Sequence, residues 1–131
     1  MSNNKKLILI ADDDCDYLFQ MEAMVSNLGF DVKTADSQHE AELMLDTVKP
    51  DLAIFDLMME NEDSGFLLAY KAKRKYPEMP IIIASAATAE TGYSFDLHNS
   101  DDQNWIKADL YLEKGIRSDQ LHREINKLLK L

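Results

Sequence analysis

Short, uninterrupted apolar runs recur along this chain, and each run ends at a polar residue. The runs cover residues 7–11, 52–55, 81–84 and 110–112. Apolar runs of this length are typical of strands buried on both faces of a parallel sheet. A further, alternating segment over 30–35 predicts a more exposed strand. Helical patterns lie between these strands, which favours an α/β fold with a parallel sheet and right-handed crossovers.

The helical segments carry recognisable start and stop signals. Asp14 and Ser37 are predicted N-caps, Gly29 is predicted to end the first helix, and Ser118 is a candidate cap for the last. The patterns predict further helices over 40–48 and 66–76, with 60–65 as a polar loop. Residues 86–108 are predicted to form a loop with one short helix.

Chain length, net charge and cysteine count limit the class of protein. At 131 residues, we expect residues 1–131 to form a single domain. A net charge of −10 argues against nucleic-acid binding, and the N-terminal apolar run is too short for a signal peptide or a membrane span. With one cysteine there can be no internal disulfide, so a reducing, cytoplasmic setting fits best.

Polar side chains follow four of the predicted strands. Asp12 and Asp13 follow the first strand, Asp56 ends the third, Ser85 ends the fourth and Lys114 lies just past the fifth. In open α/β sheets the working site lies outside the carboxyl ends of the strands. We therefore expect these five residues to converge on one edge of the domain.

The chemistry of this set favours phosphoryl transfer. Clustered carboxylates repel unless a cation joins them, and hard oxygen ligands suit Mg²⁺, or alternatively Mn²⁺. Lys114 and Ser85 could bind phosphoryl oxygens. Asp56 is the best candidate nucleophile because it stands alone at its strand end, whereas Asp12 and Asp13 are an adjacent pair.

Simpler interpretations stay open at this point. Asp12 and Asp13 could cap a helix, Ser85 could be an ordinary small residue and Lys114 a solvated one. Tyr111 could be a packed aromatic residue without a further role. The scattered histidines are not interpreted as metal ligands.

Four segments together resemble the response-regulator receiver family of two-component signalling. They are IADDD at 10–14, FDLMM at 55–59, IASA at 83–86 and YLEK at 111–114. The resemblance covers essentially the whole chain. It implies a flavodoxin-like, doubly wound (βα)5 fold with a five-stranded parallel sheet and helices on both faces. Because the chain ends shortly after the last predicted helix, we expect no output domain.

The resemblance also implies roles for individual residues. Asp56 would be the phosphoacceptor and, with Asp12, Asp13 and the backbone carbonyl of Met58, would make up the Mg²⁺ site. Ser85 and Lys114 would bind the phosphoryl group. Ser85 and Tyr111 would form the switch.

Three departures from the family pattern stand out. Gly115 replaces the proline that usually follows the lysine, where the family typically has a cis peptide bond. Glu60 replaces another frequent proline. Ser85 and Lys114 are 29 positions apart, so the segment over 86–108 is enlarged on the face that the family uses for partners.

The leading hypothesis is a phosphoacceptor module that catalyses only its own phosphorylation and dephosphorylation and is not otherwise an enzyme. The donor would be a sensor histidine kinase or a histidine phosphotransfer protein, and the face around Tyr111 would bind a downstream protein or a second copy of the chain. The alternative is a phosphorylation-independent interaction adaptor. An aspartyl-phosphate hydrolase is disfavoured, because Met58 stands where such enzymes usually carry a second aspartate as the general acid.

Overall fold

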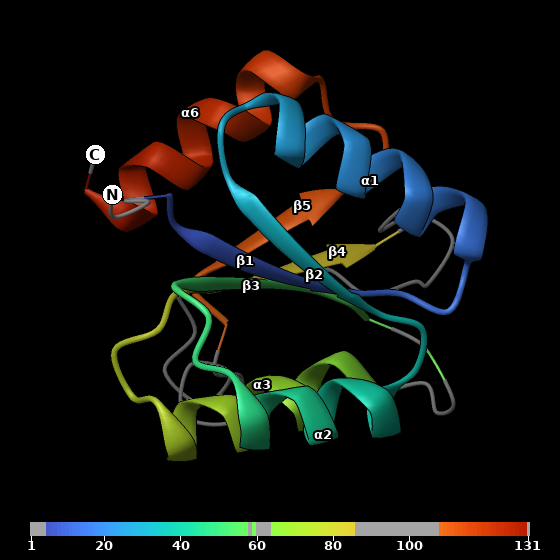
Figure 1. Cartoon of the computed structure of the whole chain (residues 1–131), viewed down its shortest axis with the longest axis vertical. Coiled ribbons are helices and arrows are strands. Elements are labelled where there is room, and N and C mark those ends of the chain that lie inside the picture. Colours follow the sequence, from blue (N-terminus) through green and yellow to red (C-terminus); the bar gives the residue numbers. More distant parts are fainter. Residues whose placement is uncertain (1–4, 58, 60–63, 86–107, 131) are drawn as a thin grey trace.

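The computed structural model describes residues 5–57, 59, 64–85 and 108–130. Strands and helices alternate along most of this part of the chain (Figure 1). In chain order the described elements are β1 (Leu7–Ala11), α1 (Cys15–Asn27), β2 (Asp31–Ala35), α2 (Gln38–Thr47), β3 (Leu52–Asp56), α3 (Ser64–Lys75), β4 (Ile81–Ser85), β5 (Leu110–Glu113) and α6 (Ser118–Leu129).

The five strands form one sheet in the order β2-β1-β3-β4-β5, and every neighbouring pair is parallel. This confirms the predicted parallel α/β architecture. The strand order reverses at β1, which has β2 on one side and β3 on the other. The carboxyl ends of β1 and β3 therefore meet at the topological switch point, where open α/β sheets place their ligands.

Helices cover both faces of the sheet: α1 and α6 lie on one face, and α2 and α3 on the other (Figure 1). Successive side chains of a strand point to opposite faces, so an uninterrupted apolar run supplies both layers. In β1, Leu9 packs on the α2–α3 side, whereas Ile8 and Ile10 belong to the core beneath α1 and α6. All three residues are buried. This two-sided burial is why the central strands are not amphipathic in sequence.

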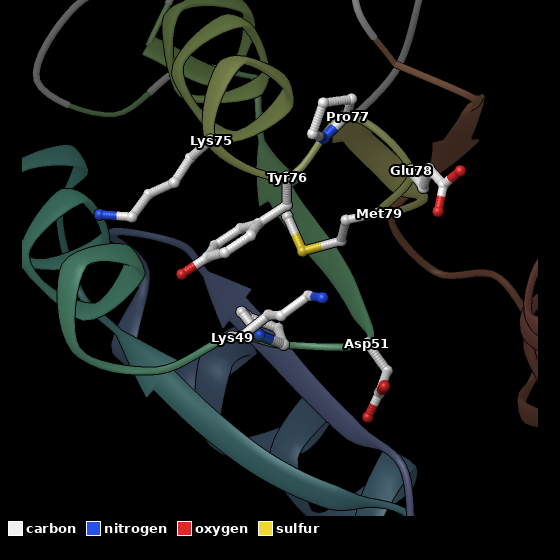
Figure 2. A pocket seen from close by; sticks show the side chains of 8 residues that line it. Lys49, Asp51, Lys75, Tyr76, Pro77, Glu78 and Met79 are labelled. Atoms are coloured by element: carbon white, nitrogen blue, oxygen red, sulfur yellow. The ribbon is translucent and has the colours of Figure 1, made fainter.

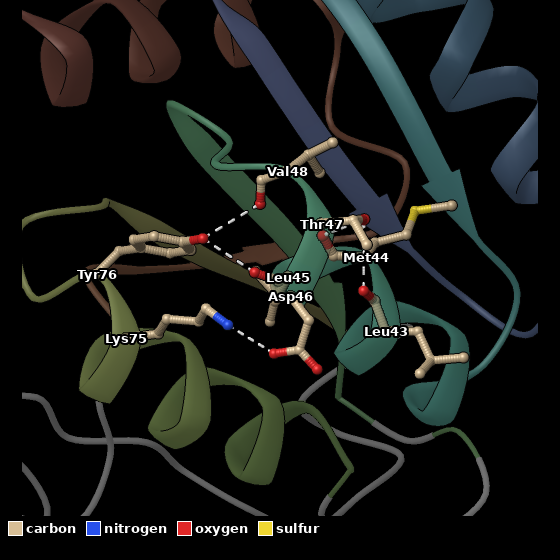
Figure 3. Close-up of polar contacts among 8 residues, drawn as sticks. All are labelled: Leu43, Met44, Leu45, Asp46, Thr47, Val48, Lys75 and Tyr76. Carbon is tan, nitrogen blue, oxygen red and sulfur yellow. Dashed lines mark hydrogen bonds and ion pairs between the residues drawn. The ribbon is translucent and has the colours of Figure 1, made fainter.

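The two helices of the α2–α3 layer are joined by polar contacts as well as apolar ones (Figure 3). The Tyr76 hydroxyl donates to the carbonyl oxygen of Leu45 at 2.9 Å and lies 3.4 Å from that of Val48. Lys75 forms an ion pair with Asp46 at 2.6 Å. Tyr76 thus satisfies carbonyl groups at the end of α2 that have no partner within the helix.

Two carboxylates fix the starts of inner strands. Asp51 accepts a hydrogen bond from the backbone N–H of Leu7, and Asp109 accepts one from that of Ile81, each at 2.8 Å. Asp109 also forms an ion pair with Lys73 at 2.8 Å. These contacts align the amino ends of neighbouring strands and so help to set the register that brings their carboxyl ends together.

The predicted caps are confirmed at the first two helices. The Asp14 side chain accepts from the backbone N–H groups of Asp16 and Tyr17, and Ser37 accepts from that of Glu40. Gly29 follows α1 with φ +100°, a left-handed conformation that glycine adopts without strain.

Two boundary predictions are wrong. Ser118 is already inside α6, and the N-cap is Arg117, whose guanidinium pairs with Asp119 and which makes no side-chain cap. Helix α3 begins at Ser64, so Ser64 and Gly65 belong to the helix and not to the preceding loop. The expected short helix within 86–108 lies outside the described residues, apart from Ala108.

Candidate functional site

Three carboxylates meet at the switch point of the sheet. Oxygen atoms of Asp12, Asp13 and Asp56 all lie within 4.8 Å of one another. Ala11 of β1 and Phe55 of β3 are register partners, so the residues that follow them in the chain are neighbours. Asp12 and Asp56 are 1% and 7% exposed, whereas Asp13 is exposed to solvent. The predicted convergence of the three acids is therefore confirmed.

Lys114 joins this cluster from the end of β5. Its Nζ lies 2.8 Å from Oδ2 of Asp12 and 3.1 Å from Oδ1 of Asp56. Its backbone N–H donates to the carbonyl oxygen of Ser85 at 2.7 Å, which extends the β4–β5 ladder beyond the strands. Ser85 itself is buried at the end of β4. All five predicted residues thus lie at one edge of the sheet.

The carboxylates carry more negative charge than Lys114 compensates. Burial, followed by the negative charge of Asp12, raises the pKa of Asp56 to about 7, although Lys114 acts in the opposite direction. Burial alone would lower the pKa of the Lys114 ammonium, but its contacts with Asp12 and Asp56 outweigh burial and raise it. A further cation would be favoured here.

The donor set fits a hard divalent cation. It consists of carboxylate oxygens and includes one exposed residue, Asp13, so the cation could keep part of its water shell. Mg²⁺ binds proteins in this way, through one or two carboxylates with several retained waters. The predicted backbone ligand Met58 lies outside the described residues, as does Glu60.

The absence of a proline after Lys114 does not displace the lysine. The Lys114–Gly115 peptide bond is trans, and Gly115 has φ +96°. Apart from its two chain neighbours, no described residue has an atom within 4 Å of the position that a Cβ at Gly115 would occupy. The chain turns through glycine at this point, while Lys114 still contacts both buried aspartates.

Tyr111 lies on the opposite face of β5 from its neighbours Leu110 and Leu112. It is partly buried against the α2–α3 core, whereas the two leucines pack toward α1 and α6. Its ring contacts that of Phe66 edge to face, with centroids 6.2 Å apart. Tyr111 is thus a packed aromatic residue three positions before Lys114. Whether it moves stays a prediction.

Gly65 is a site residue that the sequence analysis placed in a loop. A Cβ at this position would lie 2.5 Å from the carbonyl oxygen of Asp56 and 2.8 Å from Cα of Leu57. The Gly65 N–H also donates to the Leu57 carbonyl oxygen at 2.8 Å. The first turn of α3 therefore lies directly against the backbone of Asp56, which only glycine permits. The sequence signal was the glycine itself, which equally suits a loop.

Tyr17 was also missed. The Nζ of Lys114 lies 4.7 Å from the centroid of the Tyr17 ring. Tyr17 is one helical turn before Met21, on the inward-facing stripe of α1. That spacing and the adjacent Asp14 cap could have placed it beside the acidic cluster.

A hollow of about 460 Å³ lies at the opposite edge of the sheet, before β3 and β4 (Figure 2). Three of the four charged groups that line it make contacts within the protein: Asp51 with Leu7, Lys75 with Asp46, and Lys49, whose Nζ lies 5.8 Å from the centroid of the Tyr76 ring. We assign this hollow no function. Its lining residues are Lys49, Pro50, Asp51, Lys75, Tyr76, Pro77, Glu78 and Met79.

A parallel α/β domain with an acidic cluster and a lysine at its switch point defines a narrow class of protein. The family model of the response regulator receiver domain matches residues 8–126. The chain therefore belongs to the receiver domains of two-component response regulators, which have the flavodoxin-like fold and are not, in general, true enzymes.

Similar proteins agree with this assignment. The chain is 30% identical over 132 residues to the transcriptional regulatory protein GltR of Pseudomonas aeruginosa, with 99% of the chain and 51% of that protein covered. The chain thus spans about half the length of this relative. It is also 30% identical to a probable transcriptional regulator, ycf27, of Cyanophora paradoxa, again with 99% of the chain and 51% of that protein covered.

Solved structures show the same fold. A CheY-like receiver domain from Methanospirillum hungatei has a TM-score of 0.80 at 26% identity, covering 97% of this chain and 95% of that one. The response regulator TrrA from Thermotoga maritima was solved in complex with Mg²⁺–BeF. It has a TM-score of 0.75 at 25% identity, and the match covers 94% of this chain and 98% of that one. Among the described helices of this chain, none is long and apolar enough to cross a membrane.

Proposed function

We propose that the chain accepts a phosphoryl group on Asp56 in a Mg²⁺-dependent reaction and thereby switches a face that binds a partner protein. The observation that supports this proposal most directly is the pair of contacts made by the Lys114 ammonium, at 2.8 Å to Asp12 and 3.1 Å to Asp56. A lysine held between buried carboxylates is placed to bind a group that arrives at either one.

The residues divide the chemistry between them. An oxygen of the Asp56 carboxylate attacks phosphorus, and the bond from phosphorus to the donor breaks with its electron pair leaving on the donor. Lys114 then offers its ammonium to a phosphoryl oxygen, and Ser85 its hydroxyl. A bound Mg²⁺ would supply compensation for the negative charge of the carboxylates and the phosphoryl oxygens.

The proposed metal ligands are Asp12, Asp13 and Asp56, together with the backbone carbonyl of Met58. Two observations support a metal here. The carboxylate oxygens lie within 4.8 Å of one another, and burial, followed by the negative charge of Asp12, raises the pKa of Asp56 even though Lys114 is beside it. In addition, the similar protein TrrA was solved in complex with Mg²⁺–BeF.

The proposed donor is a phosphohistidine on a sensor histidine kinase or a histidine phosphotransfer protein. The proposed output is a protein partner, or a second copy of the chain, that binds the face around Tyr111. Phosphorylation adds about −1.5 to −2 charge, which would draw Lys114 and Ser85 toward the phosphoryl group. Because Tyr111 is three residues before Lys114 in the chain, a shift of β5 would change its packing on Phe66.

The test is incubation with acetyl phosphate, with Mg²⁺ or with EDTA, followed by intact mass spectrometry. We expect one phosphoryl group per chain with Mg²⁺ and none with EDTA. Asp56→Asn should remain unmodified under both conditions. A folded wild-type chain that gains no phosphoryl group would favour the alternative, an adaptor that keeps the fold without the switch.

A further inference from the structure

The Nζ of Lys114 is surrounded on three sides. Two sides are the carboxylates of Asp12 and Asp56, at 2.8 and 3.1 Å. The third is the ring of Tyr17, whose centroid lies 4.7 Å away. An ammonium within about 6 Å of an aromatic centroid is attracted by the negative face of the ring. The ring thus adds an attractive contact that does not compete for the hydrogen bonds of the ammonium.

Within the part of the chain that the structure describes, the two carboxylates and the ring are the contacts found for the Lys114 ammonium. A lysine head is a point charge on a flexible four-carbon stem. The backbone of Lys114 is fixed by its bond to Ser85, but the next residue is Gly115, whose Cβ position faces open space. The two carboxylates would hold the ammonium while both are charged. A phosphoryl group arriving at Asp56 changes one of them, whereas it leaves the Tyr17 ring chemically unchanged.

Tyr17 is itself firmly placed. Its backbone N–H donates to the Asp14 side chain at 3.2 Å, and the N–H of Asp14 donates to Oδ1 of Asp12 at 2.8 Å. The side chain packs against the core beneath α1 and α6. Burial raises the pKa of Tyr17 to about 12, so its hydroxyl stays neutral. The backbone of Tyr17 is therefore linked, through Asp14, to the same carboxylate that pairs with Lys114.

We propose that Tyr17 is a positioning residue that holds the Lys114 ammonium beside Asp56 and so sets the rate of phosphorylation. The inference rests on the proposed phosphoacceptor role of Asp56. With acetyl phosphate as donor, a new bond joins phosphorus to an oxygen of Asp56 while the bond from phosphorus to the acetate oxygen breaks. Acetate leaves with the electron pair, and Lys114 compensates charge on the transferred group without giving up a proton.

The contact is tested first by NMR on the unphosphorylated protein. Because the Nζ of Lys114 lies over the Tyr17 ring, the protons on the adjoining Cε should be shifted upfield in the wild type. The shift should be lost in Tyr17→Leu and restored in Tyr17→Phe, which keeps the ring. If the Cε protons of Lys114 in the wild type have the chemical shifts of an ordinary solvated lysine, the inference is overturned, whatever the phosphorylation result. This readout needs no variant, so it holds even if Tyr17→Leu does not fold.

The consequence is tested by the rate of phosphorylation with acetyl phosphate and Mg²⁺. We expect Tyr17→Leu to slow the reaction by about 5- to 30-fold, the range that corresponds to a partly desolvated cation–π contact, and Tyr17→Phe to recover most of the loss. Tyr70→Leu is the matched control: its exposed ring contacts Arg74, at 5.7 Å from the centroid, on α3. The Tyr70 variant should react at the wild-type rate.

A double-mutant cycle separates positioning from general damage to the fold. In a Lys114→Met background, Tyr17→Leu should have no further effect, because the ammonium that the ring positions is gone. An equal effect in both backgrounds, or an unchanged rate in Tyr17→Leu, would overturn the inference. If the wild-type chain itself gains no phosphoryl group, the proposed function fails, and with it the consequence for the rate.

Discussion

The ammonium of Lys114 lies 3.1 Å from Oδ1 of Asp56, although the two residues are 58 positions apart in the sequence. The sheet brings them together, because β4 pairs with both β3 and β5. Lys114 compensates only part of the negative charge at this edge.

Asp56→Asn should stabilise the metal-free protein at about pH 8. The substitution keeps the size of the side chain and removes a charge that burial and Asp12 disfavour. We expect the free energy of unfolding to rise by on the order of 1–2 kcal/mol, measured by urea denaturation in EDTA. Asp31→Asn, at an exposed position in β2, is the control and should change it by less than about 0.5 kcal/mol. A less stable Asp56 variant would contradict the charge imbalance.

The stability of the metal-free wild type should fall as the pH rises toward 8. The carboxyl of Asp56 has a pKa of about 7 in the folded protein, against an ordinary value of 3.8. Between these values the folded state keeps a proton that the unfolded chain has lost, so folding is favoured at the acidic end and this contribution is lost as the pH passes 7. Urea denaturation at about pH 5.5 and 8 measures the difference. In Asp56→Asn the slope over this range should be flatter, and an equal slope would rule out Asp56 as its source.

Mg²⁺ should reverse that trend. A cation that binds the folded protein stabilises it in proportion to the logarithm of its concentration, and it binds the deprotonated carboxylates. The increase in melting temperature on adding Mg²⁺ should therefore be larger at about pH 8 than at pH 5.5. Asp13→Asn should weaken this response with little effect on the metal-free protein, because Asp13 is exposed. The absence of any Mg²⁺ response in the wild type would contradict the metal site.

Gly65→Ala should directly disturb Asp56, the proposed phosphoacceptor. The new methyl group would lie 2.5 Å from the Asp56 carbonyl oxygen, so α3 or the end of β3 must move. We expect a loss of about 1–3 kcal/mol in stability together with slower phosphorylation. Gly29→Ala is the control, since it introduces strain at φ +100° at the far end of α1, where the new Cβ would meet no atom of the described residues within 4 Å other than those of its chain neighbours. It should lower stability by about 1–2 kcal/mol and leave the rate unchanged. A normal rate in Gly65→Ala would contradict the importance of this close approach.

The convergence of the acidic residues could be predicted from the sequence because it follows from topology alone. Asp12 and Asp56 each come directly after a buried run, and parallel strands place their carboxyl ends at one edge. Lys114 could be placed for the same reason. The strands themselves were clear because their two-sided burial leaves uninterrupted apolar runs.

The contacts between helices and strands could not be predicted from the sequence in this way, because they depend on how the elements pack. Gly65 suits either a loop or a helix that touches another backbone, and only the approach of α3 to Asp56 decides between them. Ser118 has the side chain of a cap, but the extended backbone that precedes the helix is that of Arg117, so α6 begins at Ser118, one residue earlier than a Ser118 cap would require. Tyr17 was not predicted as a site residue, because its contact with Lys114 depends on a turn 97 positions further along.

The central claim is that Asp56 is the residue that accepts the phosphoryl group. Reducing the acetyl phosphate-treated protein with borohydride converts an aspartyl phosphate to homoserine, and peptide mass spectrometry then locates it. We predict homoserine at position 56, only when Mg²⁺ was present. Homoserine at another aspartate, or unmodified Asp56 in a folded chain incubated with Mg²⁺, would contradict the account.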